Sequence, residues 1–506
     1  MTNKQLKNLK DTLWTTADQL RANSGLKSTE YAEPILGLIF LRFADVKYSK
    51  FEPAIKAEFD SIKGTRMERP IHEIAIEKCG FYLPEEARYD WLLNLPESED
   101  LAKKIKEAME AVEKYTAELE DTLPKDIYYS VNSEDDPLVL AKLLKNFKDI
   151  PADVELDIFG EIYEYFLGEF ALAEGQGGGE FFTPASVVRY MVEVLAPTEG
   201  KILDPACGSG GMFVQSAKFI EAHSGKRGTI SVYGQEANPD TWKLAKMNMA
   251  IRGIDADLGP NHGDTFFNDL HRNMRADFIM ANPPFNLSNW GQEKLTDDVR
   301  WRYGTPPAGN ANYAWIQHMI HHLAPNGKFG MVLANGALST QTGGEGEIRK
   351  NIIEADLVEA IVALPSNLFY SVTIPVTLWF ISKNKKQKSK TVFIDARKMG
   401  TMKDRIHREL TDEDIKKIGD TVAAFQDGKL ENVAGFCAVA DLQEIAKQDY
   451  ILTPGRYVGV EEQEDDGEPF EEKMARLTGE LSELFAQSHA LEEEIRQKLG
   501  AIGYGI

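Results

Sequence analysis

The chain has 506 residues, of which 43% are hydrophobic and 27% charged, which is typical of a folded protein with several domains. No apolar stretch approaches the ~20 residues of a membrane span, the first residues lack a secretion signal, and the three scattered cysteines argue against disulfides and against a metal site, so we expect a cytoplasmic protein without bound metal. The formal net charge of -23 opposes long-range attraction to DNA, so a nucleic-acid substrate would require a partner or a local basic patch.

Residues 1–170 are predicted to form an all-α N-terminal domain. The stretch "LAKKIKEAMEAVEKYTAELEDTL" contains neither Gly nor Pro, and Leu101, Ile105, Met109 and Val112 fall on one helical face. The segments "YAEPILGLIFLRFADVKYSKFEPAI" and "VELDIFGEIYEYFLGEFALAE" are further long helical candidates. We interpret this part as a helical bundle without a catalytic role.

Residues 171–404 are predicted to form a second domain of the α/β class. A glycine-rich hinge leads to Thr183 and Pro184, which stand in the usual order at the start of a helix. Strands and helices then alternate, which indicates a doubly wound, mainly parallel, seven-stranded sheet with ligands at the carboxyl ends of its strands. The predicted strands are 200–207, 229–236, 276–282, 327–335, 357–365, 376–384 and 391–396, and the predicted helices include 210–223, 238–253 and 312–323.

Residues 405–506 are predicted to be a helical C-terminal extension that binds a partner. In its last helix an apolar residue recurs with a seven-residue period, which fits either a short coiled coil or a helix docked on a partner or on its own chain. These residues are Met474, Leu477, Leu481, Leu484, Leu491 and Ile495. Ahead of this region, five lysines within residues 383–390 predict a solvated hairpin loop, with DNA phosphates as the other interpretation.

A glycine-rich turn, "DPACGSGGM", follows the first predicted strand and precedes a helix. Gly208, Gly210 and Gly211 would let the backbone approach a ligand closely and direct N–H groups at it. Their spacing matches neither Gly-x-Gly-x-x-Gly nor a P-loop, which disfavours a pyrophosphate ligand. A tight turn without a ligand is the simpler alternative.

Three acidic residues stand where successive strands are predicted to end: Asp204, Glu236 and Asp264. A carboxylate at the second position can accept both hydroxyls of a ribose, and one at the third can accept the adenine amine. Each alone could be a solvated acid. Together they fit an adenosine ligand that carries positive charge and no phosphate, and S-adenosylmethionine is such a ligand.

The stretch "ADFIMANPPFNLSNW" ends a predicted strand in Asn-Pro-Pro-Phe. The side-chain carbonyl of Asn282 and the backbone carbonyl of Pro283 can both accept from one NH2 group, and Pro283 and Pro284 hold them rigid. Two such acceptors would localise the lone pair of an amine as it attacks a methyl sulfonium. Phe285 offers a face for a flipped base. The alternative is a turn that only terminates the strand.

These motifs resemble those of DNA amino-methyltransferases, and more narrowly the modification (methylation) subunit of type I restriction-modification systems. "DPACGSGGM", "GQE", "GDTF" and "NPPF" stand in the gamma-type order of adenine enzymes, and "GEFFTPASVV" resembles the segment that closes over the cofactor. The resemblance implies methylation of the N6 amine of adenine in DNA. It also implies a separate specificity subunit, a restriction subunit and two copies of this chain per complex.

The resemblance also assigns site residues. Those expected to contact S-adenosylmethionine are Glu180, Phe181, Phe182, Thr183, Pro184, Ala185, Asp204, Gly208, Ser209, Gly210, Gly211, Glu236, Asp264 and Thr265. Asn282, Pro283, Pro284 and Phe285 are the expected catalytic residues. Phe369 or Tyr370 is expected to supply a second aromatic face for the base.

Three alternatives stay open at this point. A protein glutamine methyltransferase also acts on an NH2 group, although such enzymes resemble Asn-Pro-Pro-Tyr and are shorter. Methylation of the exocyclic amine of cytosine would be more usual with Ser-Pro-Pro. Attack at carbon 5 of cytosine is disfavoured because no Pro-Cys-Gln sequence occurs, which leaves Cys207 as a packing residue. The third alternative is a non-catalytic assembly subunit.

Overall fold

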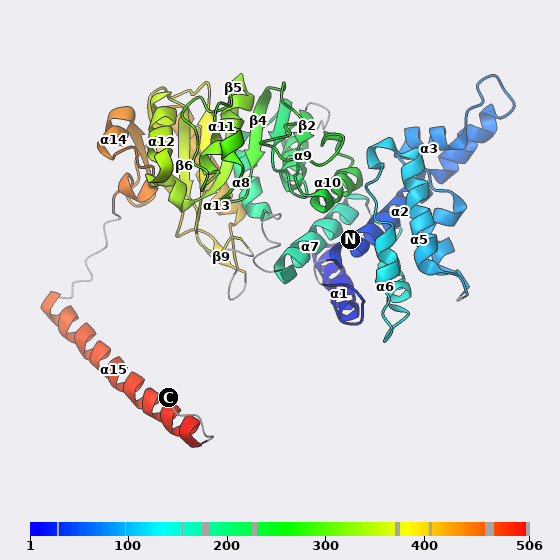
Figure 1. Cartoon of the computed structure of the whole chain (residues 1–506), viewed down its shortest axis with the longest axis horizontal. Coiled ribbons are helices and arrows are strands. Elements are labelled where there is room, and N and C mark those ends of the chain that lie inside the picture. Colours follow the sequence, from blue (N-terminus) through cyan, green and yellow to red (C-terminus); the bar gives the residue numbers. More distant parts are fainter. Residues whose placement is uncertain are drawn as a thin grey trace. The chain divides into compact units, whose positions relative to one another are not determined.

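The structure, a computed structural model, describes residues 1–27, 30–96, 98–153, 155–174, 183–224, 230–369, 375–403, 407–460 and 470–501. The chain forms two compact units, Met1–Gly459 and Val460–Ile506 (Figure 1). The first unit contains an N-terminal group of helices and a large sheet covered by helices. No helix within the described ranges is both long and apolar enough to cross a membrane.

The N-terminal region is helical, as predicted. The first half of its longest helix is buried, and a second helix buries the face formed by Ile105, Met109 and Val112. The core of this region runs from Leu13 to Phe170 and also takes in Met247 and Ile251 from a later helix. The helices are α1 (Asn3–Arg21), α2 (Ala32–Ile62), α3 (Ile71–Cys79), α4 (Tyr89–Leu93), α5 (Leu101–Tyr115), α6 (Val139–Lys148) and α7 (Asp157–Glu174).

The sheet of the first unit is doubly wound and mainly parallel, and it has nine strands rather than the predicted seven. Its order is β11-β8-β6-β7-β5-β4-β1-β2-β3, with β7 antiparallel to both neighbours and β11 antiparallel to β8. The strands are β1 (Gly200–Asp204), β2 (Ile230–Gly234), β3 (Ala256–Asp257), β4 (Ala276–Ala281), β5 (Leu323–Ala334), β6 (Val358–Ala363), β7 (Val376–Ser382), β8 (Lys390–Asp395) and β11 (Cys437–Asp441). All seven of these predicted strands are present. The two further strands are short edge strands without a long apolar run: β11 was not predicted, and β3 ends at Asp257 rather than near Asp264.

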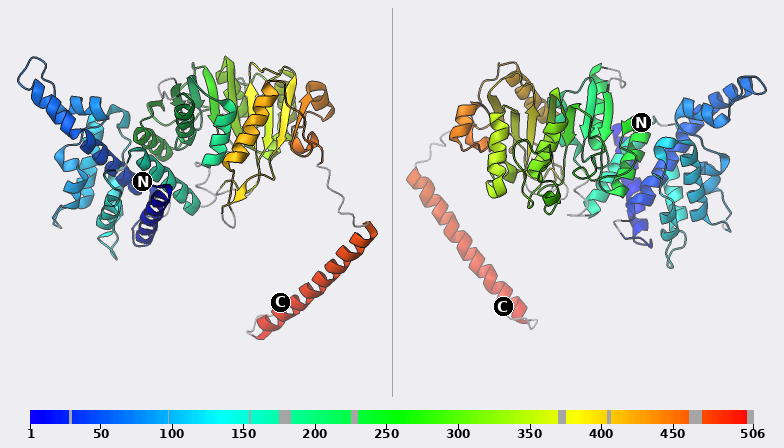
Figure 2. Two further views of the ribbon diagram at one scale, coloured as in Figure 1. Left: turned by 180° about the vertical axis from the view of Figure 1, so that it is seen from behind. Right: turned by 45° about the horizontal axis from the view of Figure 1, so that its top comes forward.

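Helices cover both faces of the sheet, so its central strands are buried on both sides. On one face lie α8 (Ala185–Leu195), α9 (Gly211–Ser224) and α13 (Asp412–Gln426); on the other lie α11 (Asn312–His322) and α12 (Glu345–Glu354) (Figures 1 and 2). Neighbouring strand residues alternate between the two cores: Ile202 and Phe380 pack on the first face, Leu203 and Trp379 on the second. Burial on both faces explains the continuous apolar runs in the sequence.

The first part of the predicted C-terminal extension is built into this sheet. α13 packs against α8, and β11 extends the sheet beyond β8. The ring of Tyr457 stacks on Phe393 of β8 at 3.8 Å between centroids. A small helix, α14 (Leu442–Lys447), and a two-stranded ribbon of β9 (Thr401–Met402) and β10 (Arg408–Glu409) complete the region.

The lysine-rich segment 383–390 is not a hairpin loop. It joins β7 to β8, and β6 lies between these two strands in the sheet. Two of its lysines are held internally: Lys385 is buried and pairs with Asp356 at 2.6 Å, and Lys383 donates to the carbonyl of Leu323 at 2.6 Å. Burial lowers the pKa of both ammonium groups. The run is therefore only partly available to a ligand.

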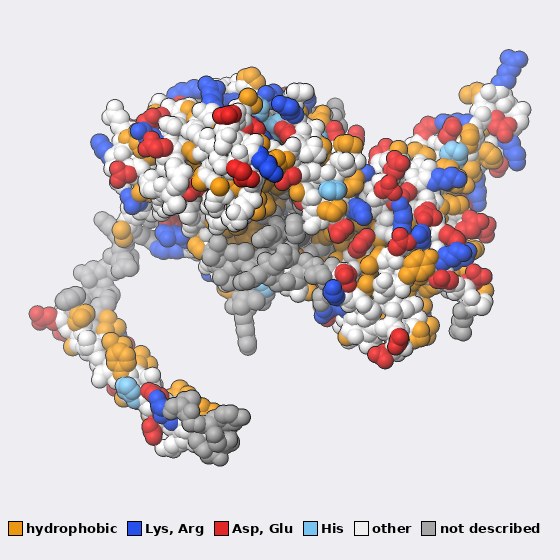
Figure 3. Space-filling view, in the orientation of Figure 1, with side chains coloured by type: hydrophobic (Ala, Val, Ile, Leu, Met, Phe, Trp, Pro, Cys, Tyr) orange, Lys and Arg blue, Asp and Glu red, His pale blue; other side chains and the backbone are white. Residues whose placement is uncertain are grey.

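The second unit contains one long helix, α15 (Phe470–Ala501). The six apolar residues of the seven-residue repeat are all 43 to 59% exposed, and Figure 3 shows hydrophobic side chains along this helix. A stripe of this kind is suited to another apolar surface. Its predicted role in binding a partner stays a prediction.

Candidate active site

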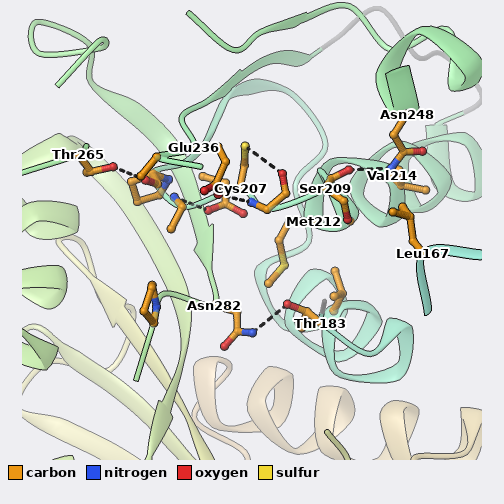
Figure 4. A pocket seen from close by; sticks show the side chains of 18 of the residues that line it. Leu167, Thr183, Cys207, Ser209, Met212, Val214, Glu236, Asn248, Thr265 and Asn282 are labelled. Atoms are coloured by element: carbon orange, nitrogen blue, oxygen red, sulfur yellow. Dashed lines mark hydrogen bonds between the residues drawn. The ribbon is translucent and has the colours of Figure 1, made fainter. Parts of the chain in front are cut away.

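A cavity of about 1060 Å³, including its open mouth, lies at the carboxyl ends of β1, β2 and β4 (Figure 4). Parallel strands bring their following loops together at this edge of the sheet. Eleven of the predicted site residues line it: Thr183, Ala185, Asp204, Gly208, Ser209, Gly211, Glu236, Asp264, Thr265, Asn282 and Pro284. Among the described residues, Pro184, Gly210, Pro283 and Phe285 are not part of its lining. Glu180, Phe181 and Phe182 lie outside the described residues.

The glycines of the turn after β1 serve different purposes. Gly208 and Gly210 have φ of 53° and 84°, which favours glycine. A Cβ on Gly210 would lie 2.7 Å from the methyl group of Met249, so this glycine allows the turn to pack on α10 (Pro239–Arg252). A Cβ on Gly211 would meet no protein atom within 4 Å, because this residue faces the cavity.

Two buried carboxyl groups form the floor of the cavity. Asp204, at the end of β1, is 1% exposed and accepts from the backbone N–H of Ala206 at 3.0 Å. Glu236 follows β2 and accepts from the N–H groups of Gly208 at 3.0 Å and Asn238 at 2.8 Å. Burial raises the pKa of both groups, and neither forms an ion pair with a basic residue in the described part of the chain. Hydroxyl donors or positive charge on a ligand would stabilise their ionised forms.

Asp264 differs from the prediction. β3 already ends at Asp257, so Asp264 stands in the following loop rather than at a strand end. Its Oδ1 accepts from the N–H groups of Phe266 and Phe267 at 2.8 and 3.3 Å, which shapes the loop as it passes the cavity. The hydroxyl of Thr265 donates to the carbonyl of Pro205 and ties this loop to the turn after β1.

Asn282 is the first residue after β4 and projects into the cavity. Its Nδ2 donates to Oγ1 of Thr183 at 3.0 Å, as Figure 4 shows, which orients the amide. Its Oδ1 is buried and has no hydrogen-bond partner among the described residues. An unpaired buried acceptor is costly, by about 1–3 kcal/mol, and such groups concentrate at functional sites.

The chain beyond Asn-Pro-Pro-Phe is anchored by α11. Asn286 has φ of 54°, and its backbone N–H donates to Oδ1 of Asn312 at 3.0 Å. Asn312 returns a bond from Nδ2 to Oδ1 of Asn286 at 2.9 Å and is itself 1% exposed. The ring of Phe285 lies 6.2 Å from that of Phe369 in an edge-on arrangement, which brings two predicted aromatic residues together. Tyr370 lies outside the described residues.

Four of the lining residues that sequence reasoning missed come from helices distant in the chain. Glu164 and Leu167 come from α7, so the N-terminal helices contribute to a site from which they were expected to be absent. Asn248 and Trp315 come from α10 and α11, and each has a buried side-chain polar atom without a hydrogen-bond partner among the described residues. These contacts join segments far apart in the chain, and no local pattern signals them.

Arg252 explains how α7 is held at the cavity. Its guanidinium, on a side chain 3% exposed, donates to Glu164 at 2.6 Å, to Asp157 at 3.2 Å and to the carbonyl of Gly160 at 2.8 Å. A Cβ on Gly160 would lie 2.4 Å from Nε of Arg252, so the close approach of α10 to α7 requires glycine there.

Two family models and several known proteins match this chain. Residues 154–466 match the family described as N-6 DNA Methylase, and residues 9–147 match the HsdM N-terminal domain. The type I restriction enzyme HindI methylase subunit of Haemophilus influenzae is 50% identical over 447 residues, which cover 86% of this chain and 98% of that protein. The MjaIX methylase subunit of Methanocaldococcus jannaschii is 41% identical over 516 residues, which cover 97% and 91% of the two chains.

A solved structure shares the fold. The methyltransferase subunit of a type I restriction-modification system from Streptococcus thermophilus superimposes with a TM-score of 0.76 at 24% identity, covering 90% of this chain and 99% of that one. Fold, order of motifs and relatives agree. The chain therefore belongs to the N-6 DNA methylase family, and within it to the type I restriction enzyme methylase subunits.

Proposed function

We propose that this chain transfers a methyl group from S-adenosylmethionine to the N6 amine of an adenine that is flipped out of DNA. The observation that carries this proposal is the buried Oδ1 of Asn282, directly after β4, which has no hydrogen-bond partner in the part of the chain that the structure describes. The experiment is transfer of tritiated methyl groups to adenine in DNA by the chain together with its specificity subunit. Absence of labelled N6-methyladenine would contradict the proposal.

The residues of the cavity fit the proposed cofactor. Asp204 and Glu236 are buried carboxyl groups suited to hydroxyl donors and positive charge, and open space lies over Gly211. Bound S-adenosylmethionine would supply a methyl group on a positively charged sulfur. Glu236 is the proposed acceptor for the ribose hydroxyls. The loop that contains Asp264 and Thr265 is proposed to contact the adenine.

Asn282 is proposed to act on the target amine. This amine is a weak nucleophile because its lone pair is delocalised into the ring. Oδ1 of Asn282 and the carbonyl of Pro283 would accept its two hydrogens, localise the lone pair and stabilise the positive charge that develops on the nitrogen. The bond between Nδ2 and Thr183 fixes the acceptor in advance, so little reorganisation is needed. Phe285 and Phe369 are the proposed faces against which the base stacks.

DNA sequence recognition is proposed to come from a separate specificity subunit, with a restriction subunit and a second copy of this chain completing the complex. The net charge of -23 supports this division, because such a chain gains little from the DNA phosphates. The isolated chain is expected to bind DNA with a dissociation constant above about 1 µM at physiological salt, and more tightly with the specificity subunit. A gel-shift titration tests this; tight, sequence-specific binding by the chain alone would contradict it.

Substitution of Gly211 by Val is expected to block the cofactor and leave the fold intact. A Cβ at this position would meet no protein atom within 4 Å, and the side chain would extend into the cavity. Binding of S-adenosylmethionine, measured by calorimetry, should weaken by about 100-fold, since overpacking a site costs about 1–3 kcal/mol. Gly336→Val is the matched control, because Gly336 is also surrounded by open space but lies away from the cavity. Normal cofactor binding by Gly211→Val would rule out this cavity as the cofactor site.

A further inference from the structure

A buried polar cluster supports the far side of the loop that contains Asp264 and Thr265. Its members are Arg300, from the segment between β4 and α11, His318 and His322 on α11, and Asp269. Arg300 is 7% exposed, His318 1% and His322 0%. Burial on this scale is costly for charged and polar groups unless they are fully hydrogen-bonded.

Every N–H of the Arg300 guanidinium has a partner. Nη1 donates to the carbonyl of Thr265 at 3.2 Å, and Nη2 to the carbonyl of Phe266 at 2.6 Å. Nε and Nη2 also donate to the carboxylate of Asp298, both at 2.8 Å, and the remaining N–H of Nη1 faces Nδ1 of His318 at 3.2 Å. The planar guanidinium thus binds two consecutive carbonyls of the loop, and Asp298 and His318 fix its orientation.

The loop held in this way forms a wall of the cavity. Thr265 and Phe266 both line it, and the ring of Phe266 packs on Trp315, another lining residue, with 4.4 Å between ring centroids. Asp264 also lines the cavity and belongs to the same turn, because its carboxylate accepts a hydrogen bond from the N–H of Phe266. Movement of the two carbonyls would therefore displace Asp264, Thr265 and the aromatic wall together.

The same cluster has the spacing of a metal site, because Asp269, His318 and His322 have ligand atoms within 4.8 Å of one another. The hydrogen bonding argues otherwise. Since Arg300 donates to Nδ1 of His318, the proton of this neutral ring lies on Nε2, which then cannot ligate a cation. His322 is also engaged on both ring nitrogens, at 2.9 Å from Oδ2 of Asp269 and 3.3 Å from the carbonyl of Met274.

We infer that Arg300 is a positioning residue for the adenosine part of the methyl donor, acting through the carbonyls of Thr265 and Phe266. This inference rests on the proposed function, because it assumes that this wall of the cavity receives the adenine. Arg300 itself does not line the cavity. Its loss should therefore raise the KM for S-adenosylmethionine and leave the rate at saturating cofactor nearly unchanged.

The test uses the full chain with its specificity subunit. Arg300→Met is expected to weaken binding of both S-adenosylmethionine and S-adenosylhomocysteine by roughly tenfold or more, since small misplacements of a binding group have effects of this size. kcat should stay within about threefold of the normal value. Arg300→Lys, which keeps the charge and can reach one carbonyl, should recover part of the affinity. Arg302→Met, at an exposed arginine two residues away, is the control and should change neither value.

The outcomes separate this inference from the function on which it rests. If the unmodified chain bound no S-adenosylmethionine, the proposed function would fail. If it bound the cofactor and Arg300→Met bound it equally well, or lost kcat with an unchanged KM, the inference about Arg300 would be wrong. Should Arg300→Met not fold, Arg300→Lys decides, and an unchanged KM in that variant would also overturn the inference.

Discussion

Replacement of Asn282 by Ala is expected to reduce kcat for methyl transfer to DNA by about 10²–10³-fold, as the loss of one preorganised polar group at a reacting centre does. The substitution removes the buried Oδ1 that has no partner among the described residues, and with it one of the two proposed acceptors. Affinity for S-adenosylmethionine should stay within about threefold, because Asn282 is proposed to act only on the target amine. Single-turnover transfer of tritiated methyl groups, with calorimetry of cofactor binding, measures both effects.

Two further variants test how Asn282 works. Asn282→Asp keeps an acceptor oxygen and should be more active than the Ala variant. Thr183→Val removes the hydroxyl that orients the amide from 3.0 Å and should cost about tenfold in kcat, since the acceptor is then free to rotate. If Asn282→Ala methylated DNA at the normal rate, the proposed mechanism would be wrong. Loss of cofactor binding together with activity would instead place Asn282 in the cofactor site.

Replacement of Arg252 by Met is expected to lower the free energy of unfolding by about 2 kcal/mol, because the buried guanidinium loses its charge-assisted hydrogen bonds to two partly exposed carboxylates. The groups that lose a hydrogen bond are the carboxylates of Glu164 and Asp157 and the carbonyl of Gly160. Since Glu164 lines the cavity, the KM for S-adenosylmethionine should rise as well. Urea unfolding of the full chain measures the first effect, and Arg272→Met, at an exposed arginine, is the control.

A double-mutant cycle tests whether the contact between Arg252 and Gly160 contributes to this stability. Gly160→Ala alone should also destabilise the chain, because its Cβ would lie 2.4 Å from Nε of Arg252 and displace the guanidinium. In the Arg252→Met background the same substitution should cost at least about 1 kcal/mol less, as residues in direct contact are not additive. Fully additive effects would show that the contact between Gly160 and Arg252 does not hold α7 to α10.

The main elements could be predicted because local sequence specifies them. Apolar runs such as those ending at Asp204 and Ala281 are buried on both faces of the sheet, and Gly or Pro marks where each stops. The glycine turn and Asn-Pro-Pro-Phe are also local, so their place at the edge of the sheet followed from the strand pattern. β3, with two residues, and β11, in a region interpreted as a tail, carry too little signal to be recognised.

The features that escaped prediction depend on distant contacts. Nothing near Gly160 indicates that Arg252 will lie against it, and nothing near Arg300 indicates that it will bind the carbonyls of Thr265 and Phe266. The sequence predicts Asp264 after the end of a strand, whereas a loop brings it to the same cavity. Short motifs thus predicted many of the residues that line the cavity, while the contacts that support the cavity could not be predicted.

The position of β7 has a consequence for the order in which this protein can fold during synthesis. β7 lies between β5 and β6, both of which leave the ribosome before it. Until residue 382 has emerged, β5 and β6 lack the strand that joins them in the sheet. Each then exposes a row of unpaired backbone N–H and C=O groups that can pair with another chain. A chain cut before β7 should therefore aggregate rather than form a smaller domain, and the half of the sheet that lines the cavity should not fold separately after a truncation at that point.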